Sequence, residues 1–541
     1  MALRNLQEQL DARWQLPSHH SITIWLADNP RLALLSSFLA LLVVQLLLTT
    51  YRVFFHPLSR FPGPFLAKFS GLWRSNRYMK GTWHDDVLEL HQKYGRIVRI
   101  APNELSIVDE FAMKHLYGHG HNAKKTAWYK VWDPPNTAPQ LFSELDKKYH
   151  AYLRKRVAGA YAMSSILKYE KYIQNCLDLL LWRLKEKAEL GPSVDMAKWT
   201  NAFAFDVVGE LAYGTQLGHL RTETDVNNLR ANVFNIFFTL SNLGHFPGQA
   251  WIVNNSLTQG LLWMMRVPPV FAEFATWSRD RVKDRIENQD KIKRDDMLSH
   301  FCRMKCKDGS PAPLNEVLIE AMNLIGAGAD TTSIGMRSCL HYLCKYPKYY
   351  RLVQDEVDNF YVANKGTEPI TYLQTQQLPM LQAVVKEATR LLPSIVFQLL
   401  RHAPYNFTVR DQYIPAGTIV GISPMAQNRD RDIFGEDANE FRPERWLEDR
   451  DKAGYMDTSL MTFGGSGPRM CVGKNIALVE IHKFIAQLLY YFDVEMVDLK
   501  NPWRITTYWF AYQRDQHMKI RLRPGRTPLR PEGLALEKKS A

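Results

Sequence analysis

One stretch near the start of the chain is apolar and carries no charge. Leu32–Thr50 holds 19 residues without an acidic or basic side chain, and Gln45 and small hydroxyl residues are its polar interruptions. As a helix rising about 1.5 Å per residue it would span ~28 Å, close to the hydrocarbon thickness of a bilayer. The preceding residues include Glu8, Asp11 and Asp28, a poor signal-peptide leader, and no A-x-A cleavage pattern follows. The pattern therefore favours an uncleaved anchor over residues 32–50 rather than a signal peptide or a buried core helix.

Basic residues are unevenly distributed about this stretch. Three precede it and six follow it: Arg4, Arg13 and Arg31, then Arg52, Arg60, Lys68, Arg74, Arg77 and Lys80. Because the side richer in Lys and Arg stays in the cytoplasm, we expect residues 1–31 to be lumenal and the bulk of the chain to be cytosolic. The pattern predicts a single-pass protein of the endoplasmic reticulum membrane.

Beyond the anchor the pattern becomes amphipathic. His56–Pro64 has three prolines in nine residues, which predicts a stiff, extended segment within a proline-rich connector over residues 51–64. From 65 to 522, long amphipathic stretches alternate with short strand-like runs such as Arg96–Ile100 and Ser106–Val108. Residues 523–541 are rich in Pro, Arg and Lys, and we expect them to form a loose tail.

The longest helical pattern runs from Pro313 to Lys345 and stops before Pro347. Such a helix would be ~50 Å long and would cross an entire domain. Within it, Gly326-Ala-Gly-Ala-Asp-Thr-Thr332 offers a carboxylate and two hydroxyls where two glycines weaken the helix. The segment is either a packing kink with its Asp facing solvent, or a local distortion whose acid and hydroxyl form an O2 pocket with a proton relay.

Composition narrows the class of protein. Of the 541 residues, 46% are hydrophobic and 23% are charged, the balance of a globular protein with a substantial core. The formal net charge of +13 suits nucleic acid, an anionic membrane or an acidic protein partner, but no arginine-rich tract or zinc-type spacing favours nucleic acid. The six cysteines lack the density of a secreted disulfide framework, so we expect them to be reduced.

One cysteine stands in a setting suited to chemistry. Phe463-Gly-Gly-Ser-Gly-Pro-Arg-Met-Cys-Val-Gly473 places Cys471 in a glycine-rich loop directly before a helical pattern. The N–H groups and dipole of a helix start stabilise a thiolate, which can ligate iron. Glycines let the backbone approach a flat macrocycle, and Arg469 can neutralise an acidic edge of it. The loop suggests haem with an axial thiolate, and the alternative is a buried free cysteine.

Two charged motifs follow the long helical pattern. Glu387-Ala-Thr-Arg390 places opposite charges three residues apart on one helical face, which alone is ordinary surface decoration. Phe441-Arg-Pro-Glu-Arg-Trp446 supplies Arg445, a second guanidinium that could close a buried network around Glu387. Such a network has to be fully hydrogen-bonded to be tolerated.

These four motifs occur in the order found in cytochrome P450 enzymes, and the chain resembles that family over about residues 55–522. It is most similar to membrane-bound fungal members of secondary metabolism, of the pisatin demethylase type, in Asn201-Ala-Phe-Ala-Phe-Asp-Val-Val-Gly-Glu210 and Gly473-Lys-Asn-Ile-Ala-Leu-Val-Glu480. The resemblance implies a mainly α fold with small β-sheets, the cytochrome P450 fold, and a haem-thiolate catalytic domain over residues 65–522.

The resemblance also implies roles for single residues. Cys471 looks like the axial ligand to the iron of haem b, and Asp330 and Thr331 look like the acid and alcohol that deliver protons during O2 activation. Three further residues resemble the structural triad of the family: Glu387, Arg390 and Arg445. Three basic residues match positions that bind the haem propionates: Arg154, Arg401 and Arg469.

Two positions depart from the family pattern. Phe463 stands eight residues before Cys471, where the family has its Phe seven residues before, so we expect the loop to bulge by one residue. His150 takes the place of the Trp that precedes Arg154 in the family. We therefore carry over Arg154 as a haem contact and leave open whether His150 merely packs.

The implied reaction inserts one atom of O2 into a substrate and releases the other as water. No Gly-x-Gly-x-x-Gly fingerprint or flavin domain is evident, so we expect electrons from a separate NADPH-dependent flavoprotein reductase. A basic cluster could dock the acidic face of that reductase, or be an ordinary solvated surface: Lys147, Lys148, Arg154, Lys155, Arg156 and Lys474.

Five segments resemble the substrate-recognition regions of the family and are rich in aromatic residues: Trp128–Trp132, Phe234–Phe238, Leu324–Ala327, Ile395–Gln398 and Tyr508–Phe510. A mostly apolar pocket suits a lipophilic polyketide, terpenoid or indole-type metabolite, although the same residues could be core. One alternative function is a haem-thiolate isomerase or dehydratase that needs no O2, against which Asp330 and Thr331 argue. The other is a non-enzymatic haem sensor or lipophile carrier.

Overall fold

A computed structural model describes residues 30–121, 123–133, 137–191, 193–246, 272–366 and 369–531, together with a few isolated positions between 249 and 264. It divides into two compact units, Met1–Arg60 and Phe61–Ala541. The lumenal segment expected at 1–31 lies outside the described residues except for Pro30 and Arg31, and so do residues 532–541 of the expected tail.

The first unit contains the helix α3, Pro30–Thr50, which continues as the π-helical turn η1, Tyr51–Phe55. Neither element buries a side chain within the protein, and leucines are exposed around α3. Within the described part of the chain, Pro30–Phe55 is the one helix long and apolar enough to cross a membrane. An apolar surface on every face of a helix is what contact with lipid requires.

The connector after the anchor differs from the expected extended segment. Tyr51–Phe55 is helical, and the His56 N–H closes it onto the Tyr51 carbonyl at 2.8 Å. A turn follows, in which the Ser59 N–H donates to the His56 carbonyl at 2.7 Å. The extended conformation expected for His56–Pro64 is therefore wrong for residues 56–60, which form a turn. The helix continues to Phe55 because Pro57 is the first proline after the anchor, so every residue before it can donate to a helical hydrogen bond.

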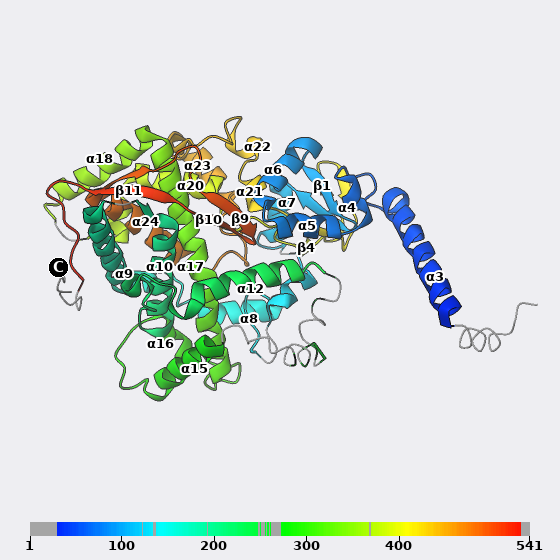
Figure 1. The fold of residues 1–541 in the computed structure, drawn as a ribbon, viewed down its shortest axis with the longest axis horizontal. Helices are drawn as coiled ribbons and strands as arrows, with labels where there is room; N and C mark the ends of the chain where they lie inside the picture. Colours follow the sequence, from blue (N-terminus) through cyan, green and yellow to red (C-terminus); the bar gives the residue numbers. More distant parts are fainter. Residues whose placement is uncertain are drawn as a thin grey trace, which may run out of the picture. The chain divides into compact units, whose positions relative to one another are not determined.

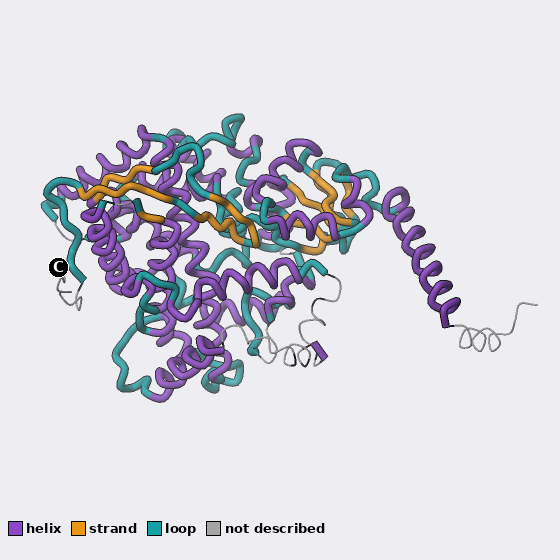
Figure 2. The backbone as a smooth tube through the Cα atoms, in the orientation of Figure 1, coloured by secondary structure: helices purple, strands orange, loops and turns teal. Residues whose placement is uncertain are grey.

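The second unit is mainly helical (Figure 2). Its α-helices are α4 (Phe65–Phe69), α5 (Leu72–Lys80), α6 (Trp83–Tyr94), α7 (Glu110–Tyr117), α8 (Lys147–Val157), α9 (Met163–Leu190), α10 (Met196–Tyr213), α11 (His219–Thr222), α12 (Leu229–Leu243), α15 (Ala272–Glu287), α16 (Met297–Cys302), α17 (Leu314–Lys345), α18 (Pro347–Ala363), α19 (Tyr372–Thr375), α20 (Pro379–Leu391), α21 (Pro424–Gln427), α22 (Arg431–Phe434), α23 (Arg450–Thr458) and α24 (Lys474–Tyr491). Three short 3₁₀ helices are η2 (Ala127–Trp132), η3 (Val226–Asn228) and η4 (Pro443–Trp446).

The long helix α17 is the centre of this unit (Figure 1). It begins after Pro313 and ends before Pro347, as its sequence pattern predicts. It packs against α10, α15, α16, α18, α20 and α24, and most of its residues are buried. Because α17 contacts helices from distant parts of the chain, it fixes the positions of α10 on one side and of α20 and α24 on others.

The strands form small sheets at the edge of the helical core. They are β1 (Ile97–Ala101), β2 (Glu104–Ile107), β3 (Val194–Asp195), β4 (Arg401–His402), β5 (Phe407–Val409), β6 (Gln412–Ile414), β7 (Ile419–Gly421), β8 (Phe492–Met496), β9 (Arg504–Tyr508), β10 (Phe510–Arg514) and β11 (His517–Leu522). The largest sheet has the order β1-β2-β7-β4, in which β2 and β7 are parallel, and β3-β11-β8 form a second sheet. Two further sheets are the hairpins β5-β6 and β9-β10.

The β9-β10 hairpin turns at a single residue. Tyr508 pairs with Phe510, so Trp509 alone forms the tip, with φ of 71°. A left-handed backbone is unusual for a tryptophan. The tip is held because the Val396 N–H donates to the Trp509 carbonyl at 3.1 Å and the indole is 98% buried among other aromatic rings. Tertiary packing thus fixes a bulky side chain where local preference would not.

Candidate active site

The Cys471 loop is held closely against the rest of the protein. Gly464 and Gly465 have φ of 82° and 80°, and the Cys471 N–H donates to the Phe463 carbonyl at 2.9 Å. A Cβ on Gly467 would lie 1.6 Å from the Tyr117 carbonyl oxygen, so the backbone approaches there as only glycine allows. Phe463 therefore stays tied to the cysteine although it stands one residue further away than the family spacing.

The Cys471 side chain is exposed, but many protein atoms surround it. Because of these surrounding atoms, burial raises the pKa of the thiol. The Gly473 and Lys474 N–H groups at the start of α24 and the Arg154 cation lower that pKa, but burial outweighs them. The helix start alone therefore does not produce the thiolate, and a metal cation at the sulfur would.

Five basic side chains gather close to this loop, three of them the predicted propionate contacts: Arg154, Arg401, Arg469, Lys125 and His150. Their hydrogen bonds go largely to neutral oxygens: Arg154 to the Met470 carbonyl at 2.8 Å, Arg401 to the Tyr129 phenol at 2.9 Å and Arg469 to the Glu144 carbonyl at 2.9 Å.

The charges in this basic cluster repel one another. Burial and then Arg469 and Arg401 push the pKa of Lys125 well below its ordinary range. Burial and the same cations lower the pKa of His150 to about 3, so this imidazole is neutral. The Arg401 Nε is buried without a hydrogen-bond partner among the described residues. An excess of buried positive charge beside a thiol is the environment that the two carboxylates of a haem would neutralise, so the residues present fit that group.

Lys125 is the member of this cluster that the sequence analysis missed. It is 4% exposed and forms a β-bridge with Arg401, which lies far away in the sequence. The Lys125 Nζ donates to the Phe142 carbonyl. The one signal in the sequence is a lysine pair directly before an aromatic run, which is too common to assign.

The helix α17 continues without a break through residues 326–332. The expected distortion is therefore not an interruption of the helix. The Thr331 and Thr332 hydroxyls donate to the carbonyls one turn earlier, at 2.7 Å to Ala327 and 2.8 Å to Gly328, so they share acceptors with the helical backbone bonds. Ala327 is exposed in the middle of a helix most of whose residues are buried. Ala327 and Thr331 are one turn apart, so they share the uncovered face of the helix.

Asp330 faces different surroundings from Thr331. It is 5% exposed, and its Oδ1 accepts a hydrogen bond of 2.7 Å from the Asn201 side chain of α10. Burial raises the pKa of Asp330, and the Asn201 bond and Arg337 only partly oppose this. Asp330 and Thr331, predicted as an acid and alcohol pair, are thus adjacent in the sequence but lie in separate environments. The Asp330 side chain is buried among polar groups, and the Thr331 side chain lies on the uncovered face of α17.

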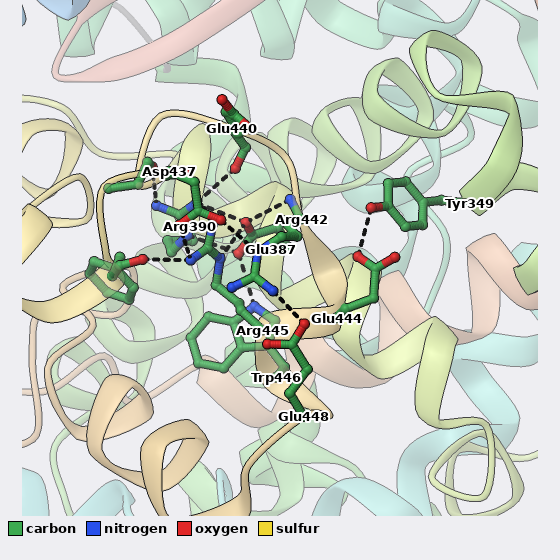
Figure 3. Close-up of polar contacts among 12 residues, drawn as sticks. Tyr349, Glu387, Arg390, Asp437, Glu440, Arg442, Glu444, Arg445, Trp446 and Glu448 are labelled. Carbon is green, nitrogen blue, oxygen red and sulfur yellow. Dashed lines mark hydrogen bonds and ion pairs between the residues drawn. The ribbon is translucent and has the colours of Figure 1, made fainter.

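Glu387 is the centre of a buried ionic network (Figure 3). Glu387 and Arg390 are fully buried on α20, and the carboxylate receives both Nε and Nη2 of Arg390 at 2.8 Å. Arg445 of η4 adds its Nε at 3.0 Å. The structure thus brings together the three residues that the resemblance assigns to a triad.

The remaining polar atoms of this network are also satisfied. Glu387 accepts bonds from the Arg442 N–H at 3.1 Å and from the Trp446 indole at 2.9 Å, neither of which sequence reasoning assigned. Arg390 donates to the Asn428 and Ala438 carbonyls at 2.6 and 2.7 Å. Burial raises the pKa of Glu387, but Arg390 and Arg445 overcome this effect and hold it below its ordinary value. The network is an anchor between α20 and the segment that leads to the cysteine loop.

The aromatic recognition segments form one cluster. The Trp128 and Trp509 rings stack at 4.7 Å, and Phe237 of α12 lies 4.4 Å from Phe510. The Gln398 side chain, in contrast, is hydrogen-bonded to the Tyr78 phenol at 2.7 Å and to the Ser106 hydroxyl at 3.1 Å. The aromatic residues therefore form one apolar cluster, and the polar groups of Gln398 are bonded within the scaffold beside it.

The predicted docking cluster separates into two groups. Lys147, Lys148 and Lys155 are exposed on α8. Arg154 instead points toward the cysteine loop, and Arg156 forms an ion pair with Glu316 at 2.6 Å. Three lysines of the six basic residues thus present charge to solvent on α8.

Comparison with known proteins identifies relatives of the whole chain. Residues 60–518 match the family described as cytochrome P450. The cytochrome P450 monooxygenase cicH of Emericella nidulans is 32% identical over 503 residues, which covers 91% of this chain and 99% of that protein. The cytochrome P450 monooxygenase gsfF of Penicillium aethiopicum is 32% identical and covers 86% and 94%. A pisatin demethylase of Fusarium vanettenii is 29% identical and covers 87% and 90%.

Proposed function

The chain belongs to the cytochrome P450 family, and on this premise we propose that it is a membrane-anchored monooxygenase that inserts one O2-derived oxygen atom into a lipophilic secondary metabolite. The observation that carries the proposal is the uncovered but enclosed Cys471 sulfur beside an excess of buried positive charge. A cysteine sulfur beside a cluster of cations fits haem, because the sulfur can ligate the iron and the cations can bind the propionates.

Haem b is the form of the cofactor that we propose. Cys471 would hold the iron, and Arg154, Arg401 and Arg469, helped by Lys125, would hold the propionates. Bound haem supplies the reductive activation of O2, which no side chain can perform. Neutralisation of the crowded cations by the propionates would return Lys125 to its charged form and order the loop around the sulfur.

The protein's own residues would position substrate and move protons. The Thr331 hydroxyl proton is committed to the Ala327 carbonyl, so its oxygen is free to accept a hydrogen bond on the uncovered face of α17. Burial raises the pKa of the Asp330 carboxyl, so this group holds its proton more tightly than an exposed carboxyl, as a proton donor must before it acts. The aromatic cluster of Trp128, Trp509 and Phe510 would exclude water and orient an apolar substrate.

Relatives supply the argument for the substrate class. The similar proteins are named as fungal monooxygenases and as pisatin demethylase. Together with the apolar cluster, this supports a polyketide, terpenoid or indole-type metabolite as the substrate. Comparing extracts of a strain that lacks this protein with its parent would identify the substrate as the precursor that accumulates.

The helix Pro30–Phe55 supports an anchor in the endoplasmic reticulum membrane with the catalytic unit in the cytosol. Electrons would then come from an NADPH-dependent flavoprotein reductase on the same membrane. The exposed lysines of α8, Lys147, Lys148 and Lys155, would dock its acidic face, and no role for nucleic acid is proposed.

The central test is spectroscopic and catalytic. The purified full chain should show the reduced-CO absorption band of a haem thiolate, and Cys471→Ala should lose it while the matched variant Cys306→Ala keeps it. With reductase and substrate, one atom of labelled O2 should enter the product. Turnover under nitrogen without NADPH would instead indicate the isomerase or dehydratase.

Docking is tested separately. Reversal of Lys147, Lys148 and Lys155 to Glu should raise the KM for reductase at least several-fold at low salt and leave the absorption spectrum unchanged. Reversal of Lys168 and Lys171, exposed on α9, is the control and should leave the KM unaltered. Equal kinetics for the two sets of variants would contradict docking on α8.

A further inference from the structure

The side chain of Asp330 has two carboxyl oxygens in different states. Oδ1 accepts the 2.7 Å hydrogen bond from Asn201, whereas Oδ2 is buried and takes no part in that bond. The Tyr512 phenol of β10 is also buried, and the carboxyl of Asp330 is its polar neighbour. It lies close enough to Asp330 that, after burial itself, the carboxyl is the main influence raising the pKa of the phenol.

The two buried groups lie side by side, and each is the hydrogen-bonding neighbour of the other. A buried carboxyl beside a phenol can exchange a proton with few competing partners. The other charged groups that act on Asp330 are Arg337, two turns further along α17, and Arg230 of α12. Arg337 is itself committed to the Ala197 carbonyl at 3.1 Å and the Ser333 hydroxyl at 3.1 Å.

Asn201 is more exposed than the residues that it contacts in this cluster. It is half-buried on α10, whereas Asp330, Tyr512 and Arg337 are buried. Its amide nitrogen can only donate, so it bonds the carboxyl whether or not the acid is ionised. An asparagine at this point fixes the rotation of the Asp330 side chain without adding a charge.

We propose that Asn201 is a positioning residue for the reaction: it holds Oδ1 of Asp330 on the α10 side, so that Oδ2 is the oxygen that exchanges protons, with the Tyr512 phenol as its neighbour. The inference rests on the proposed role of Asp330 in proton delivery. In each exchange Oδ2 gives up one proton toward the reaction site and regains one from solvent water, while Oδ1 stays bonded to Asn201. No electrons are transferred, and the carboxyl returns to its starting state.

The first test follows the carboxyl directly and does not depend on turnover. Infrared difference spectra over a pH titration of the full-length protein should show the carbonyl stretch of a protonated carboxyl, assigned by its loss in Asp330→Asn. In Asn201→Leu, which keeps the volume but removes the donor, the midpoint should move to higher pH, because the lost bond favoured the ionised form. An unchanged band and midpoint would overturn the contact.

The second test asks whether position matters for the reaction. Asn201→Leu should form about tenfold less product per NADPH consumed, with more hydrogen peroxide and a larger solvent isotope effect, since misplaced acids lose much of their contribution. Tyr512→Phe should shift the pH profile, while Tyr213→Phe, which removes another buried phenol from α10, should not. Equal coupling and pH profiles in Asn201→Leu and wild type would refute the positioning role. Failure of the wild type to turn over would refute the proposed function and leave the infrared result to decide on Asn201.

Discussion

The buried network around Glu387 makes a quantitative prediction about folding. Glu387→Gln keeps the shape of the side chain but removes its charge, and leaves Arg390 and Arg445 buried without a carboxylate between them. Five donors meet this carboxylate, from Arg390, Arg442, Arg445 and Trp446, and an amide can accept at only one of its two terminal atoms.

Breaking a buried ion pair by removing one partner costs about 3–5 kcal/mol, because the remaining charge stays desolvated. Domains are stable by only about 5–15 kcal/mol, so the substitution should remove a large share of the stability. Glu444→Gln is the matched control on the neighbouring η4 segment. Glu444 binds Lys348 and Tyr349 in a partly exposed position, where an ion pair contributes at most about 1 kcal/mol.

The assay is denaturant unfolding together with retention of haem absorbance. Because the pKa of Glu387 is lowered on folding, its contribution is complete above the pKa of the unfolded carboxyl and is lost as the pH falls through the folded pKa. The gap between wild type and Glu387→Gln should therefore be full at pH 7 and narrow in acid. Equal midpoints at pH 7 for Glu387→Gln and Glu444→Gln would refute the reasoning.

Three further predictions concern single buried positions. Glu480 is fully buried with no hydrogen-bond partner among the described residues, and burial raises its pKa. The folded protein therefore keeps a proton that the unfolded chain releases above about pH 4.3, so the stability of the wild type falls as the pH rises. Glu480→Gln should have a higher denaturant midpoint than the wild type at pH 8 but not at pH 4. Lys125→Met should lower haem retention on dilution while the haem-free protein becomes no less stable, since burial and the neighbouring cations already disfavour the charge of this lysine. Lower stability of the haem-free protein would contradict this. Gly467→Ala, whose Cβ would collide with the Tyr117 carbonyl, should lose haem absorbance, whereas Gly454→Ala, with open space around its Cβ, should keep it.

Local patterns in the sequence were sufficient for the elements and for the chemistry of single motifs. The uncharged stretch at 32–50 falls within α3, and the pattern from Pro313 to Lys345 matches α17 within one residue. These features depend on side chains a few positions apart, which the periodicity of a helix brings together in any context. The connector after the anchor is the exception, because proline content alone does not say where a helix ends before the first proline.

Contacts between distant segments were decided only by the tertiary structure. Lys125 meets Arg401, Asn201 meets Asp330, and Trp446 meets Glu387 across 276, 129 and 59 residues. The tertiary structure also decides why the Asp330 and Thr331 side chains lie in different surroundings. Adjacent residues of a helix point about 100° apart. The packing of α10 against α17 then determines which of the two side chains is buried among polar groups. The sequence by itself thus determined which elements form and which residue types could bind haem and move protons. Which side chains meet was set by the packing of helices, because this depends on the rotation and register of elements that no local pattern encodes.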